Sequence, residues 1–93
     1  MSESQAEPTA EQLVEELRKI KVRDMLVHTS SMLASLAYGK LAPDTRDLDD
    51  ARLAIDALRA LLPVLPEQER NDVQQVVTNL QLAYADAAAG KSD

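Results

Sequence analysis

The chain has 93 residues, with 16 Asp and Glu against 10 Lys and Arg, which gives a formal net charge of −6 at pH 7. This length fits one domain with a single hydrophobic core and excludes two domains. The negative charge disfavours nucleic acid and anionic membranes as partners, and with Tyr38 and Tyr84 as its only aromatic residues the chain offers no stacking platform for bases.

The N-terminal region combines a polar tail with a short helix. Residues 1–8 are rich in Ser, Glu and Gln, so they are predicted to form a disordered tail, and they lack the basic and apolar parts of a signal peptide. Thr9 followed by Gln12 forms a capping-box pattern. The apolar residues that follow form a narrow stripe: Leu13, Leu17 and Ile20. A first helix is therefore expected over about 10–20.

A second apolar pattern begins at Val22, nearly opposite the first stripe if one helix carries both. Its members are Val22, Met25, Leu26, Thr29, Met32, Leu33 and Leu36. Either the chain breaks where the second pattern begins, or one helix of roughly 48 Å runs over 9–40 and uses both faces. The break is favoured. It gives a second helix over about 22–40, which Gly39 and then Pro43 end.

The back of this second helix carries mostly small residues: Val27, Ser31, Ala34 and Tyr38. Such a stripe is either a weakly polar surface in contact with solvent or a tight contact with another helix. Exposed Ala and Ser are common in proteins, so solvent is the preferred interpretation.

The most regular segment of the chain predicts a helix over about 48–62. Asp47 can cap it together with Asp50, and Pro63 prevents its continuation. Apolar residues cover most of its circumference and leave one polar strip: Asp49, Arg52, Asp56 and Arg59. These spacings allow opposite charges to pair along the helix, and a helix this apolar is surrounded by other helices of its own chain or of a partner.

The last helix follows a proline-rich connection. Pro63 and Pro66 prevent the intervening segment from being helical throughout, because proline disfavours helical geometry in the residue before it. Pro66 suits the first position of a helix over about 66–89, which Gly90 stops. Its apolar stripe is ordinary: Val73, Val76, Val77, Leu80, Ala83, Tyr84 and Ala87.

Together these elements predict an all-α fold, a small antiparallel bundle of three main helices plus the shorter N-terminal helix. One domain should span 9–89, with residues 90–93 frayed. The central helix has too little polar surface for a three-helix monomer, so part of its apolar arc is left for a second chain. The candidate interface is Leu53, Ala57, Ala60 and Leu61. A two-fold homodimer is the simplest way to cover it.

Three signals follow one another along the chain: a helix end at Leu36-x-x-Gly39, then after an acidic and proline-containing loop the run Asp47-Leu48-x-x-Ala51-Arg52-x-x-Ile55-Asp56-x-Leu58, and a last helix reaching Tyr84. This order resembles the small bacterial helical proteins grouped as domain-of-unknown-function family eighteen-forty-four. The similarity covers residues 21–87. The family is bacterial and cytoplasmic and has no established activity or catalytic residues, so the resemblance implies a fold and no site.

The residues that could carry chemistry do not form a site. Asp24, His28 and Ser31 or Ser35 share one side of the second helix, but a straight helix face supplies neither an oxyanion hole nor a cleft, and an intrahelical pair of Asp24 with His28 is the better interpretation. The same pair is too small a ligand set for a metal ion. We therefore expect no enzyme, no cofactor and no metal.

Two charged clusters have ordinary explanations as well. The acidic residues before and within the first turn of the central helix lack the ligand pattern of an EF-hand and suit helix capping: Asp44, Asp47, Asp49 and Asp50. The basic cluster can dock on phosphate or on an acidic partner, or it can be a solvated face: Arg18, Lys19, Lys21 and Arg23.

Two functions remain as hypotheses. The leading one is a non-catalytic, self-associating helical interaction or structural module, a homodimer with an unknown protein partner. The absence of cysteine fits a cytoplasmic location, and the longest candidate membrane span, residues 25–42, is too polar for a membrane helix. The alternative is an accessory protein that docks on a translation or other nucleoprotein machine through Arg18–Arg23.

Overall fold

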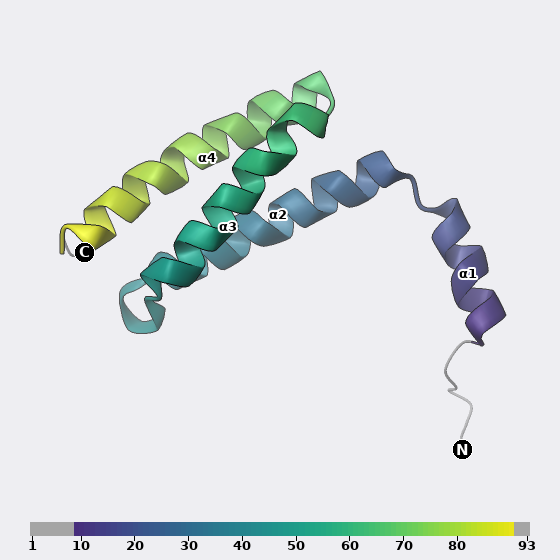
Figure 1. Cartoon of the computed structure of the whole chain (residues 1–93), viewed down its shortest axis with the longest axis horizontal. Helices are drawn as coiled ribbons and strands as arrows, with labels where there is room; N and C mark the ends of the chain where they lie inside the picture. Colours follow the sequence, from purple (N-terminus) through teal and green to yellow (C-terminus); the bar gives the residue numbers. More distant parts are fainter. Residues whose placement is uncertain (1–8, 91–93) are drawn as a thin grey trace, which may run out of the picture.

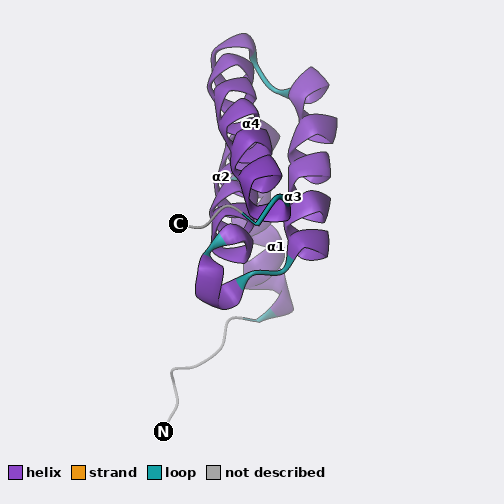
Figure 2. Cartoon of the chain, turned by 90° about the vertical axis from the view of Figure 1, so that its left-hand side faces the viewer, coloured by secondary structure: helices purple, strands orange, loops and turns teal. Residues whose placement is uncertain are grey.

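The structure is a computed structural model that describes residues 9–90. In this range it contains four α-helices and two short 3-10 turns, and no strand (Figure 2): α1 (Ala10–Lys19), α2 (Val22–Leu41), Pro43–Thr45, α3 (Leu48–Leu61), Leu62–Val64 and α4 (Glu67–Ala88). The predicted all-α class is confirmed. The predicted tail over 1–8 and the last three residues of the predicted frayed end lie outside the described residues.

α1 begins with the predicted capping box and ends at a break. The Thr9 hydroxyl oxygen accepts a hydrogen bond from the Gln12 amide at 3.1 Å, and the Gln12 side-chain oxygen accepts one from the Thr9 amide at 2.9 Å. Ile20 and Lys21 are extended, with ψ angles of 128° and 137°, and separate α1 from α2. The favoured break is therefore confirmed. The break places the two apolar stripes on separate helices, and only the stripe of α2 contributes to the core.

The core lies where α2, α3 and α4 contact one another pairwise. Figure 1 shows the chain reversing direction between α2 and α3 and again between α3 and α4. The buried apolar cluster comes from all three helices: Ala37, Leu41, Ala51, Ala54, Ile55, Leu58, Val77, Leu80 and Ala87. Leu58 of α3 and Leu80 of α4 are fully buried within it. Burial of each such leucine side chain contributes about 1.5–3 kcal/mol.

α1 lies apart from this three-helix unit. It contacts none of the other described helices and has no buried residue. Figure 1 shows it projecting from the N-terminal end of α2, away from α3 and α4. The radius of gyration of 17.4 Å reflects this shape, because a compact chain of this length has a radius of about 12 Å. The residues that build the core therefore begin only with α2.

Two helix ends differ from the prediction. α2 passes through Gly39 and continues to Leu41, because Leu41 is buried in the core. The helix then ends before Pro43, which forces an extended conformation on the residue that precedes it. Pro66 caps α4 and does not occupy its first turn, while Gly90, with φ of +77°, ends this helix as predicted.

Side-chain hydrogen bonds stabilise the connection between α2 and α3 and the connection between α3 and α4. Asp47 accepts a hydrogen bond from the Asp50 amide at 3.1 Å, which confirms the predicted cap of α3. The guanidinium of Arg46 donates to the Leu41 carbonyl, with the shorter contact at 3.0 Å, and so caps the C-terminal end of α2. Arg70 has the same role at the end of α3. A cation beside the carbonyl end of a helix is favourable because it opposes the helix dipole.

Candidate interaction surfaces

The side chains considered for a catalytic relay lie in the open. Asp24, His28, Ser31 and Ser35 are all exposed on α2. Ser31 and Ser35 line a groove toward α4, whereas His28 does not. Residues 9–90 contain no group of three or more His, Cys, Asp or Glu side chains that could hold a metal ion. His28 therefore lies outside the groove that Ser31 and Ser35 line.

Acidic residues at the start of α3 are used in local interactions. Asp47 caps the helix, as described above, and the carboxylate of Asp50 lies 3.2 Å from the ammonium of Lys40 on α2. This ion pair joins α2 and α3 at the ends that the connecting loop brings together. An exposed pair of this kind contributes about 0–1 kcal/mol.

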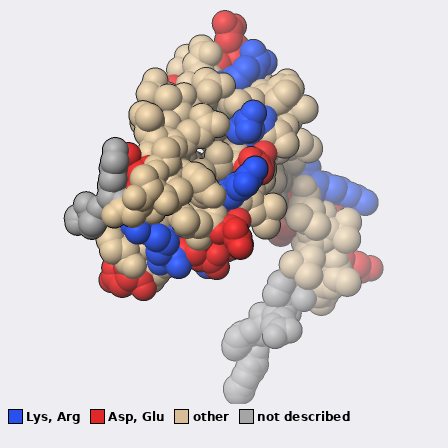
Figure 3. All heavy atoms as spheres, turned by 60° about the vertical axis from the view of Figure 1, so that its left-hand side comes forward, with Lys and Arg blue, Asp and Glu red and all other residues tan. Residues whose placement is uncertain are grey.

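The predicted basic cluster is divided between two helices. Arg18 and Lys19 end α1 and pair with Glu15 and Glu16 of the same helix at 3.4 and 3.5 Å. Arg23 belongs to α2 and pairs with Glu69 of α4 at 3.4 Å. On the face that Figure 3 shows, basic and acidic side chains lie next to one another and do not gather by sign. The positive potential of the cluster is therefore weakened by nearby carboxylates.

Two of the predicted interface residues, Leu53 and Ala57, lie beside α2. Leu53 is 67% exposed, Ala60 is exposed, and Ala57 and Leu61 are half-buried. Leu53 and Ala57 line a shallow groove of about 140 Å³ between the two helices, together with Leu33 and Leu36 of α2. The groove therefore adjoins Leu53 and Ala57, whereas Ala60 and Leu61 do not line it.

Residues of α2 form the other half of this apolar surface. They belong to the apolar pattern that begins at Val22. Met25, Met32 and Leu36 are all exposed, and their spacings place them on one side of α2. The sequence feature that indicates this half of the surface is the breadth of the apolar pattern of α2, because so broad a pattern cannot be buried entirely. We call the surface formed by these α2 and α3 residues the α2–α3 face: Met25, Met32, Leu36, Leu53, Ala57 and Ala60.

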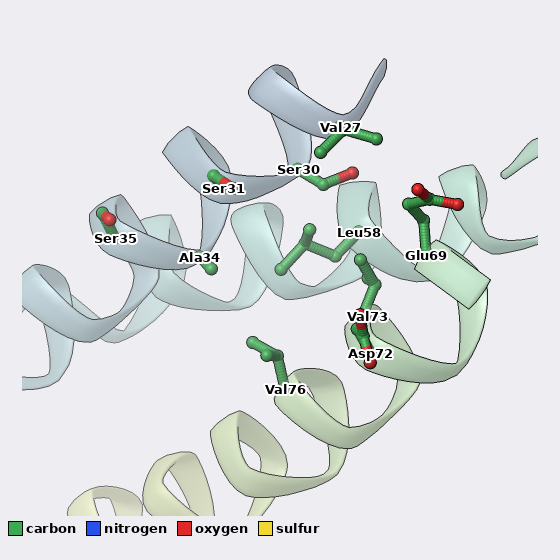
Figure 4. Close-up of a pocket in the computed structure, with 10 residues that line it drawn as sticks. All are labelled: Val27, Ser30, Ser31, Ala34, Ser35, Leu58, Glu69, Asp72, Val73 and Val76. Carbon is green, nitrogen blue, oxygen red and sulfur yellow. The ribbon is translucent and has the colours of Figure 1, made fainter. Parts of the chain in front are cut away.

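A larger groove, about 390 Å³ in volume, separates α2 from α4 (Figure 4). Its α2 side is built mostly from small residues, Ser30, Ser31, Ala34 and Ser35, with Val27 at one end. Leu58 of α3 forms its floor. Its α4 side carries both apolar residues, Val73 and Val76, and two carboxylates, Glu69 and Asp72. The small-residue stripe of α2 therefore turns partly toward another helix, although α4 does not fill the space in front of it.

Two polar atoms at this α2–α4 groove are buried without a hydrogen-bond partner among the described residues. Ser30 is only 3% exposed, and its hydroxyl oxygen is one of them. The other is Oε1 of Glu69, whose Oε2 accepts from Arg23 at 3.4 Å. A buried polar atom left without a partner is unfavourable, which makes both atoms acceptors for a donor that enters the groove.

None of the helices in residues 9–90 has both the length and the apolar character needed to cross a membrane. Comparisons of the chain with protein-family models, with curated proteins and with solved structures gave no match.

Proposed function

We propose that this protein is a non-catalytic helical module that self-associates into a homodimer through the α2–α3 face. The observation that carries the proposal is the exposure of Leu53, at 67%, beside a groove lined by Leu36 and Ala57. Single exposed leucines are ordinary on protein surfaces, whereas several large apolar side chains around one groove are typical of an interaction site.

The partner that best suits this face is a second copy of the same face. A two-fold axis brings a patch against itself, so an apolar patch meets an apolar patch. The charged residues at the rim, Lys40 and Asp50, already pair with each other at 3.2 Å, so docking leaves neither charge buried alone. In this proposal α2, α3 and α4 form a small antiparallel bundle, and two such bundles join in the cytoplasm.

Sedimentation equilibrium of the full chain at tens of micromolar tests this proposal. The expected result is a dimer for the natural sequence and a weaker dimer for Leu53→Glu. Leu82→Glu is the matched control, because Leu82 is also a leucine, is 63% exposed and lies on α4, away from the α2–α3 face. The mass of a monomer for the natural chain at this concentration would contradict the proposal.

The second hypothesis, docking on a nucleoprotein machine through Arg18–Arg23, has weaker support. Three of the four basic side chains of the cluster have a carboxylate within 4.0 Å.

Membership of the bacterial helical family described under the sequence motifs is likewise a proposal that rests on those motifs. It implies no activity that would conflict with a dimeric module.

A further inference from the structure

The isolated position of α1 is physically unusual. Helices shorter than about 12–15 residues are marginal in water unless an apolar face packs against something. α1 has 10 residues, and Leu13, Val14 and Leu17 are all about half exposed or more, so no part of the described chain supplies that packing. A capped helix with an uncovered apolar stripe therefore needs a surface beyond its own three-helix unit.

The α2–α4 groove has the shape of a helix-binding surface. Ser31, Ala34 and Ser35 are small, so the backbone of another helix can approach α2 closely along this side. Val73 and Val76 present apolar surface to the same space, and Leu58 forms its floor. A helix with a narrow apolar ridge fits such a groove better than a flat or wholly polar surface does.

One basic residue of α1, Arg18, is opposite in charge to the carboxylates of the groove. The groove carries the carboxylates of Glu69 and Asp72, and the buried atoms Ser30 Oγ and Glu69 Oε1 lack a hydrogen-bond partner among the described residues. On α1, Arg18 directly follows Leu17 of the apolar stripe. Within residues 9–90, Arg18 is held by an exposed pair with Glu15 at 3.4 Å, which a stronger acceptor can replace.

We propose that the α2–α4 groove binds the α1 helix of a second copy of this chain. The chain's own α1 is directed away from the groove, because the extended residues Ile20 and Lys21 turn it outward at the start of α2 (Figure 1). Leu13 and Leu17 of the incoming helix pack over the small residues of α2, and its Arg18 donates to Glu69 and Asp72. A two-fold axis makes this exchange reciprocal, so the assembly closes as a dimer.

The inference rests on the proposed self-association, but it uses a different surface of the molecule. The α2–α3 face contains Leu53, whereas the groove contact contains Leu17, so one substitution at each site separates the two. The two contacts do not compete for the same residues, since the groove and the α2–α3 face lie on different sides of α2.

Site-specific crosslinking tests the contact directly. The chain contains no cysteine, so introduced cysteines are the only thiols. Val14→Cys on α1, labelled with nitrogen-15, is mixed with unlabelled Ser35→Cys at the groove and treated with a short bis-maleimide. The expected product is a covalent heterodimer between the labelled and unlabelled chains. The control replaces Ser35→Cys by Leu82→Cys, and it should give at most about one tenth as much product.

Each other outcome of the crosslinking overturns the proposal. A yield no higher than that of the Leu82→Cys control would show that α1 does not reach the groove of another chain. A doubly substituted chain, Val14→Cys with Ser35→Cys, provides the remaining comparison. If it crosslinks within one chain while the mixture gives no heterodimer, the occupant is the chain's own α1 and the exchange is wrong.

Sedimentation of Leu17→Glu gives an independent readout. Leu17 and Leu82 are equally exposed, at 63%, and neither contributes to the core of the three-helix unit, so both variants fold. The expected result is a dimer dissociation constant raised roughly tenfold or more by Leu17→Glu, since a charge enters an apolar contact, and one nearly unchanged for Leu82→Glu. A dimer weakened by Leu53→Glu and unaffected by Leu17→Glu overturns the groove contact alone. The reverse pattern overturns the α2–α3 face alone.

Discussion

The guanidinium of Arg70 donates a hydrogen bond to the carbonyl oxygen of Leu65 at 2.9 Å and a second to that of Leu62 at 3.1 Å. One side chain of α4 thereby satisfies two carbonyl groups in the turn that follows α3. Leu65 itself is buried, so this turn is part of the packed structure.

Replacing Arg70 by alanine should lower the free energy of unfolding by about 1–2 kcal/mol, because two charge-assisted hydrogen bonds to carbonyl groups are lost. Urea unfolding followed by circular dichroism measures the change. Arg52→Ala is the control, since Arg52 is exposed on α3 and should cost less than about 0.5 kcal/mol. Equal effects of the two substitutions would contradict the capping role of Arg70.

The two glycines should respond oppositely to alanine. Gly39 lies inside α2, has no positive φ, and has no atom within 4 Å of where a Cβ would stand. Gly39→Ala should therefore stabilise the protein by about 0.5–1 kcal/mol.

Gly90 has φ of +77°, a conformation that strains any residue with a Cβ. Gly90→Ala should therefore destabilise the end of α4, with a loss of about 1 kcal/mol or less because the position is exposed. Thermal unfolding of both variants checks the pair. A midpoint lowered by Gly39→Ala would mean that α2 does not continue through this residue.

The core centres on Leu58, which is fully buried and also forms the floor of the α2–α4 groove. Leu58→Ala should cost about 2–5 kcal/mol in the free energy of unfolding, because apolar contacts are lost and a cavity is left. Leu82→Ala, at an exposed position of α4, should cost about 0.5 kcal/mol or less. Chemical denaturation measures both, and similar losses would mean that the packing of α3 is misassigned.

The α2–α3 face gives a prediction about concentration. The natural sequence should show a thermal midpoint that rises with protein concentration, since association stabilises the folded chains by mass action. Leu53→Glu should flatten this dependence by weakening the dimer roughly tenfold or more. Leu82→Glu should retain it. A midpoint that does not vary with concentration in the natural sequence would count against self-association through any surface.

The sequence by itself determined the helices of this protein and most of their limits. The capping box at Thr9, the cap at Asp47 and the stop at Gly90 depend on residues within one turn of each other, so they can be identified without knowing the fold. The break between α1 and α2 was also predictable, because two apolar stripes on opposite faces cannot serve one straight helix.

Only the tertiary structure decided which apolar residues are buried. Leu36 and Leu41 belong to the same helix, yet Leu41 is in the core and Leu36 lies on the α2–α3 face. Likewise, α2 continues through Gly39 to Leu41, which is buried in the core. Arg46 and Arg70 cap helix ends because the preceding helices end within reach of their side chains. Periodicity gives the direction of a side chain around its own helix, whereas burial depends on the other helices packed against it. For the same reason the sequence could nominate Leu53 as an interface residue, but the α2 half of that face and the α2–α4 groove became visible only once the three helices were packed together.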